Sequence, residues 1–113
     1  MAIAFEDNHV QDVQILSVTG RLDAATVPLF EAHYAQLAEA GRKKMLFDFS
    51  GVEYLSSIAL RSLLAIHKKL SAEGGKLVLC GVKGTVWDVF ELSGFSEILH
   101  LADTMELALG KLL

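Results

Sequence analysis

The sequence predicts an α/β protein in which a mixed β-sheet of about five strands packs against about four helices. Short apolar runs alternate along the chain with longer segments whose apolar residues recur every three or four positions. This pattern indicates alternating strands and helices. Two strands precede the alternation, so the expected order is ββαβαβαβα and the sheet is not purely parallel.

The two strands expected first are separated by a polar segment. Residues 3–5 are short and apolar, as in an edge strand, whereas residues 13–18 are β-branched and partly alternating, which is typical of a better-formed strand. We expect residues 6–12 to form the hairpin connection. Residues 19–23 include Gly20 and are expected to leave the second strand through a turn.

A helix and a central strand are expected next. From Thr26 the apolar spacing becomes three to four residues, which predicts an amphipathic helix that ends before Gly41. Pro28 falls in its first turn, where a missing N–H is tolerated. Residues 45–49, Met-Leu-Phe-Asp-Phe, are apolar on both faces and predict a central strand.

The rest of the chain continues the alternation. The expected elements are a helix, a strand, a second helix and a short strand, over residues 58–70, 76–80, 82–92 and 98–101. Glycines at positions 74, 75 and 94 separate these segments. Asp103 is expected to cap a final helix, because its carboxylate can accept from the first free N–H groups.

The composition restricts the possible functions. A chain of 113 residues suits one domain, residues 1–113, and 52% hydrophobic residues argue against disorder. The net charge of −4 makes a nucleic-acid partner unfavourable. Early Glu6 and Asp7 predict no signal peptide, and no apolar run is long enough to span a bilayer. Cys80, in an apolar run, predicts a structural thiol in a reducing cytoplasm.

Few residues point to catalysis or to a cofactor. The phosphate-binding patterns GxxxxGK[ST] and GxGxxG do not occur. His9, His33, His67 and His100 stand singly, and none has a second ligand at metal-binding spacing. We therefore expect no enzymatic activity, no cofactor and no metal. A hydrolase that used Ser57 would need a base, and the GxSxG elbow is missing.

Two adjacent serines, Ser56 and Ser57, stand directly before the helix expected at 58–70. One interpretation is that a serine simply caps the helix. The other is that a serine accepts a phosphoryl group, whose charge of about −1.5 to −2 is favoured near a helix N-terminus. Both roles are compatible if Ser56 caps the helix and Ser57 is modified.

Three segments occur in the order of motifs from a known family. They are VTGRLDAAT at 18–26, FDFSGV with YLSSIALRSLL at 47–64, and VFELSGF at 89–95. These segments resemble the STAS domain, and in particular the stand-alone anti-sigma factor antagonists of bacteria. The resemblance extends over nearly the whole chain and implies a STAS-like fold.

The resemblance also implies a partner-switching mechanism in transcription regulation. The unphosphorylated domain would bind a GHKL-type serine kinase that doubles as an anti-sigma factor, and this binding would release the sigma factor. Phosphorylation of Ser57 would end the binding, and a PPM-type serine phosphatase would restore it. The implied partner-binding residues lie before the first helix and at the start of the second: Leu22, Asp23, Thr26, Ser56, Ser57, Ile58, Ala59 and Arg61.

Two alternatives remain open. One is a STAS binding module of a transport or signalling assembly that works without phosphorylation. Ile58-Ala59 stands where the family usually has a small pair ending in glycine, and this favours the binding module slightly, whereas an intact Ser57 in a stand-alone acidic chain favours the switch. The other is a small hydrolase that uses Ser57, which the missing base disfavours.

Overall fold

The chain folds around a five-stranded mixed sheet, seen here in a computed structural model that describes residues 3–113. The strands follow the order β1-β2-β3-β4-β5, with β1 antiparallel to β2 and all other neighbours parallel. The predicted order ββαβαβαβα is confirmed. The elements, in chain order, are β1 (Ala4–Val10), β2 (Val13–Leu22), α1 (Val27–Ala38), β3 (Lys44–Leu55), α2 (Ser57–Ala72), β4 (Lys76–Cys80), α3 (Gly84–Ser93), a 3₁₀ turn (Phe95–Glu97), β5 (His100–Ala102) and α4 (Met105–Leu112).

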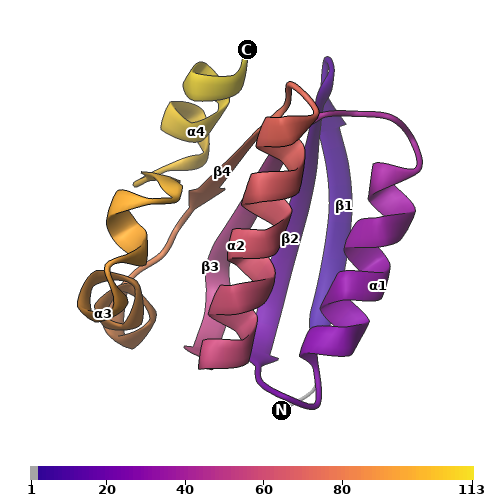
Figure 1. Ribbon diagram of the computed structural model, residues 1–113. Coiled ribbons are helices and arrows are strands. Elements are labelled where there is room, and N and C mark those ends of the chain that lie inside the picture. Colours follow the sequence, from indigo (N-terminus) through magenta and orange to yellow (C-terminus); the bar gives the residue numbers. More distant parts are fainter. Residues whose placement is uncertain (1–2) are drawn as a thin grey trace.

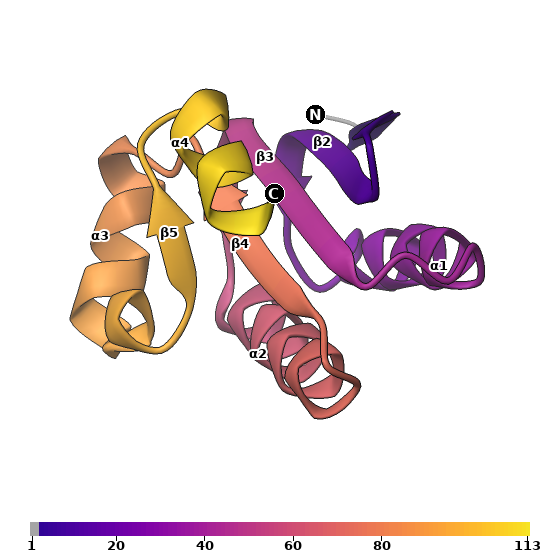
Figure 2. The same ribbon diagram turned by 90° about the horizontal axis from the view of Figure 1, so that it is seen from above.

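Helices cover both faces of this sheet (Figures 1 and 2). α1, α2 and α3 pack on one face, where their apolar residues join a core with Phe47, Phe49 and Leu79. α4 packs on the opposite face, through Ala108 and Leu112. Neighbouring residues of a strand point to opposite faces, so β3 and β4 must be apolar at successive positions to serve both cores.

The first two strands are longer than the sequence predicted. β1 runs from Ala4 to Val10 and includes most of the polar segment expected to be a hairpin connection, so that prediction was wrong. Only Gln11 and Asp12 form the turn, with Gln11 at φ 53°. β1 is an edge strand with largely exposed side chains. Backbone pairing with β2, together with packing of Phe5 and Val10 against the two cores, holds it in place.

The carboxyl ends of β2 and β3 also extend beyond their predicted limits. β2 continues through Gly20 to Leu22, where a turn was expected, and register shifts beside Thr19 and Gly20 accommodate the change. β3 continues past Phe49 to Leu55. A side chain on Gly51 would collide with the Thr19 methyl group, because its Cβ would lie 2.4 Å away. A larger residue at this position would therefore require the Thr19 side chain to move.

The C-terminal end of the chain required two corrections. The last helix is capped by Thr104, whose Oγ1 accepts a hydrogen bond from the N–H of Leu107 at 3.2 Å, and not by Asp103. Asp103 stands one residue too early to reach this N–H. β5 begins at His100, later than expected, because the 3₁₀ turn takes up residues Phe95–Glu97.

The single cysteine is a buried structural thiol, as predicted. Cys80 ends β4 and belongs to the core under α4. Burial, together with the Asp48 carboxylate beside it, raises the pKa of the Cys80 thiol to about 12. The side chain is therefore neutral at physiological pH and poorly nucleophilic.

Candidate functional site

Two turns of the chain meet at one end of the sheet. β2 and β3 are parallel, so the turn that follows β2 and the turn that follows β3 leave from the same end. Leu22 pairs with Leu55, and the N–H of Ser56 donates to the carbonyl of Leu22 at 2.9 Å. The segment before α1 and the N-terminus of α2 therefore lie side by side, at the lower end of Figure 1.

The turn before α1 is fixed by its own side chains. The Asp23 carboxylate accepts from the N–H groups of Ala25 and Thr26, at 3.0 and 3.1 Å. The Thr26 hydroxyl donates to the carbonyl of Arg21 at 2.7 Å and accepts from the N–H of Asp23 at 2.9 Å. Burial raises the pKa of Asp23, but hydrogen bonds from Thr26 and Ala25 and the nearby Arg21 outweigh it, so the net pKa is lowered. Asp23 is thus held as an anion in a rigid turn.

The two serines at the start of α2 have different environments. Ser56 has an extended backbone, and its Oγ accepts a hydrogen bond from the N–H of Ala59 at 3.3 Å, which makes it the N-cap. Ser57 is the first helical residue and is exposed. Within residues 3–113, the Ser57 hydroxyl forms no hydrogen bond with another side chain or with the backbone. One serine therefore stabilises the helix, and the other presents a free hydroxyl.

The exposed surface at this end of the sheet combines apolar and charged groups. Ile58 and Tyr54 are 44% and 41% exposed. The Arg21 guanidinium lies 4.2 Å from the centre of the Tyr54 ring, a cation–π contact, and its Nε is 3.9 Å from the Asp23 carboxylate. Arg21 and Tyr54 escaped the sequence analysis, because only the strand register places them opposite each other.

Six of the eight predicted partner-binding residues have side chains at or near this surface. Leu22 and Ala59 do not, because they are 0% and 1% exposed and belong to the core. Their side chains pack into the core beneath the two turns and cannot touch a partner. The predicted contact surface therefore narrows to Asp23, Thr26, Ser56, Ser57, Ile58 and Arg61.

The histidines lie away from the free serine. His67 is on α2 ten residues after Ser57, about 15 Å along the helix axis. Its ring meets that of His100 edge to face at 5.6 Å, and His33 contacts the Asp7 carboxylate at 2.6 Å. Among residues 3–113, no three histidine, cysteine or acidic side chains cluster in a way that would hold a metal ion.

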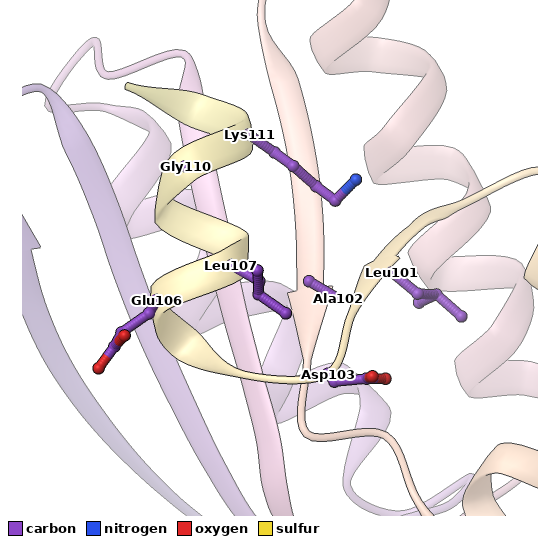
Figure 3. A pocket seen from close by; sticks show the side chains of 7 residues that line it. All are labelled: Leu101, Ala102, Asp103, Glu106, Leu107, Gly110 and Lys111. Atoms are coloured by element: carbon purple, nitrogen blue, oxygen red, sulfur yellow. The ribbon is translucent and has the colours of Figure 1, made fainter.

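A groove of about 510 Å³ lies between α4 and β5 (Figure 3). Leu107 points into it, and Lys111 and Asp103 stand at its two ends. α4 packs on the sheet face opposite to α2, so this groove and the free serine lie on different sides of the molecule. The groove therefore takes no part in the surface around Ser57.

Comparison with known proteins identifies the family. A model of the STAS domain matches residues 4–108. The chain belongs to the STAS domain family. One relative, BtrV of Bordetella bronchiseptica, carries the name of an anti-sigma factor antagonist and is 33% identical over 101 residues, which cover 89% of this chain and 87% of BtrV.

Solved structures support the same fold for this STAS domain. An anti-sigma factor antagonist from Mycobacterium paratuberculosis superimposes with a TM-score of 0.90, at 24% identity, over 98% of this chain and 94% of that one. A protein from Thermotoga maritima, also described as an anti-sigma factor antagonist, superimposes with a TM-score of 0.89 at 27% identity, over 96% of this chain and 93% of that one. In the part of this STAS domain that the structure describes, no helix is long and apolar enough to cross a membrane.

Proposed function

We propose that this STAS domain is a cytoplasmic anti-sigma factor antagonist that works by partner switching. In its unphosphorylated form it binds a GHKL-type serine kinase that acts as an anti-sigma factor, through the surface around Ser57. Phosphorylation of Ser57 ends this binding, and a PPM-type serine phosphatase restores it. The domain performs no catalysis itself.

The observation that carries this proposal is the division of roles between two neighbouring serines. Ser56 is occupied as the N-cap, because its Oγ accepts from the N–H of Ala59. Ser57 is exposed at the first position of α2. A phosphate on Ser57 leaves the cap intact, so modification changes the surface without removing a hydrogen bond that stabilises the helix.

The chemistry of the switch follows from the position of Ser57. The kinase transfers the γ-phosphoryl group of ATP to the Ser57 Oγ, the hydroxyl proton is lost, and ADP leaves. The product carries about −1.5 to −2 charges next to the exposed Ile58, the following residue of the helix. A partner that covers this apolar side chain would have to desolvate the new charge, which opposes binding.

The test is phosphorylation with defined components. Each GHKL-type serine kinase of the source organism is purified and incubated with the chain and ATP, and the phosphate is located by mass spectrometry. At least one kinase should bind the unmodified chain, place one phosphate on Ser57, and lose affinity for the product by a factor of 10 or more, as expected for about 1.4 kcal/mol.

Two variants give matched controls. Ser57→Ala should keep kinase binding and accept no phosphate. Ser56→Ala removes the neighbouring hydroxyl, and should still be phosphorylated at position 57. Phosphate on Ser56 in the parent chain, or no phosphate from any active kinase, contradicts the proposal.

A second candidate function is a binding module of a transport or signalling assembly that never uses phosphorylation. The exposed Ile58 favours it, because a branched side chain adjoins the Ser57 hydroxyl at the position where a kinase must approach. Under this alternative a partner binds the parent chain, but active kinases leave Ser57 unmodified. Phosphorylation of an Ile58→Gly variant under the same conditions would show that the Ile58 side chain excludes the kinase.

A further inference from the structure

Arg61 is a cation without a counter-ion on α2. It is exposed, and it takes part in none of the ion pairs between residues 3–113. The helix Ser57–Ala72 contains no acidic residue, so no carboxylate stands three or four positions away within α2. The side chains that Arg61 meets at that spacing are Ser57 and Ile58 on one side and Leu64 and Ala65 on the other.

Arg21, Asp23 and Glu31, three charged groups near the two turns, already have partners. Arg21 lies over the Tyr54 ring and near the Asp23 carboxylate, and the same carboxylate accepts two backbone N–H groups. Glu31 of α1 accepts a hydrogen bond from the Ser62 hydroxyl at 2.8 Å. Arg61 therefore differs from these three groups, because it has no partner that it would have to give up.

Ser57 and Arg61 are four residues apart on one helix. Side chains at this spacing are neighbours, with Cβ atoms about 5–6 Å apart. The order also suits the helix dipole, because the residue that gains negative charge is N-terminal to the cation. An arginine can bind two phosphate oxygens at once through its planar guanidinium group, which a lysine cannot do.

We propose that Arg61 captures the phosphate on Ser57 and thereby withdraws from the partner surface, an inference that rests on the proposed phosphorylation of this serine. In the unmodified chain Arg61 is free to contact an acidic group of the kinase. In the modified chain the guanidinium group binds the phosphate on the same helix. Phosphorylation then weakens the complex twice, by adding a charge that must be desolvated and by removing a cation that the partner used.

The test installs phosphoserine at position 57 during protein synthesis, so that no kinase is needed. The second pKa of the phosphate, ordinarily about 6, is measured by ³¹P NMR titration. A nearby cation favours the dianion, so this pKa should be lower by about 0.3 or more in the parent than in Arg61→Gln. Arg61→Lys should fall between the two. The Arg61 Nε–H resonance should shift on phosphorylation in the parent.

Lys68→Gln is the matched control. This variant removes one positive charge from the same helix, seven residues further on, and should leave the phosphate pKa within error of the parent. Equal pKa values in the parent and Arg61→Gln would overturn the inference, as would an equal effect of Lys68→Gln. A shift confined to Arg61→Gln, combined with no kinase that modifies Ser57, would uphold the contact between Arg61 and the phosphate but reject the proposed function.

Discussion

At the scale of single residues, Ser56 and Ser57 have identical side chains but different roles, because they occupy successive positions at the start of α2. Ser56 has an extended backbone, which directs its Oγ towards the N–H of Ala59. Ser57 is already helical, and its side chain projects to solvent. The backbone conformation therefore assigns the roles, although the two residues have the same chemistry.

This difference predicts unequal effects on stability. Ser56→Ala removes the N-cap and should lower the free energy of unfolding by about 1 kcal/mol. Ser57→Ala should change it by less than about 0.5 kcal/mol, because it deletes an exposed hydroxyl without a partner. Urea unfolding followed by circular dichroism measures both values. Equal losses in the free energy of unfolding would show that Ser56 does not cap the helix alone.

The behaviour of Arg61 also depends on its immediate neighbours in the helix. Its side chain has no acidic neighbour at helical spacing, and the exposed Ser57 stands four residues before it. The helix thus carries a free hydroxyl and an unpaired cation about one turn apart. Under the proposed phosphorylation of Ser57, a single modification would reverse the charge at this point of the surface.

At the scale of elements, α2 is positioned by its two ends. Its N-terminus is tied to β2 through the hydrogen bond from Ser56 to Leu22. Its C-terminus passes through Gly75, whose Cα lies so close to β3 that an added Cβ would be 2.2 Å from the carbonyl oxygen of Lys43. The N–H of Lys76 donates to the same oxygen at 2.9 Å, so the backbone here has little freedom to move.

We therefore expect Gly75→Ala to destabilise the fold by about 2 kcal/mol or more, because the new methyl group overlaps backbone atoms. Gly110→Ala is the matched control, since nothing lies within 4 Å of the added Cβ in α4. It should be neutral or stabilising by up to about 1 kcal/mol, because alanine favours a helix. Thermal unfolding of the two variants compares them directly. A tolerated alanine at position 75 would contradict the close approach.

At the scale of the whole molecule, the sheet joins two apolar layers. One contains α1, α2 and α3, and the other contains α4. Phe30 of α1 is fully buried at the centre of the first layer, with its ring 5.5 Å from that of Phe47 and 6.4 Å from that of Phe49. β3 and β4 contribute side chains to both layers, so loss of packing on one face should be felt on the other.

This arrangement predicts that the chain unfolds as one domain. Phe30→Ala should cost about 3–5 kcal/mol, and the loss should appear equally in circular dichroism and in the fluorescence of Trp87, the single tryptophan, on the distant α3. Leu92→Ala, at a side chain 88% exposed, should change little. If the unfolding transition reported by Trp87 fluorescence were unchanged in Phe30→Ala, the chain would contain two units that unfold independently.

The local pattern of apolar residues was sufficient to predict most of the helices and strands. The spacing of apolar residues located α1, α2, β4 and α3 to within about two residues. It was insufficient for β1, because Glu6 to His9 are polar and are held by backbone pairing with a neighbouring strand. The end of β2 was missed because Gly20 indicated a turn, although Leu22 beyond it is buried.

By itself, the sequence determined the order of strands and helices, the family, and the pair of serines at the start of α2, since these depend on residue types at short spacing. The tertiary structure decided which serine caps and which is free, that Leu22 and Ala59 are buried, and that Arg21 meets Tyr54. These outcomes depend on strand register and on backbone direction at a turn, which bring together residues far apart in the chain, and no local pattern encodes such contacts.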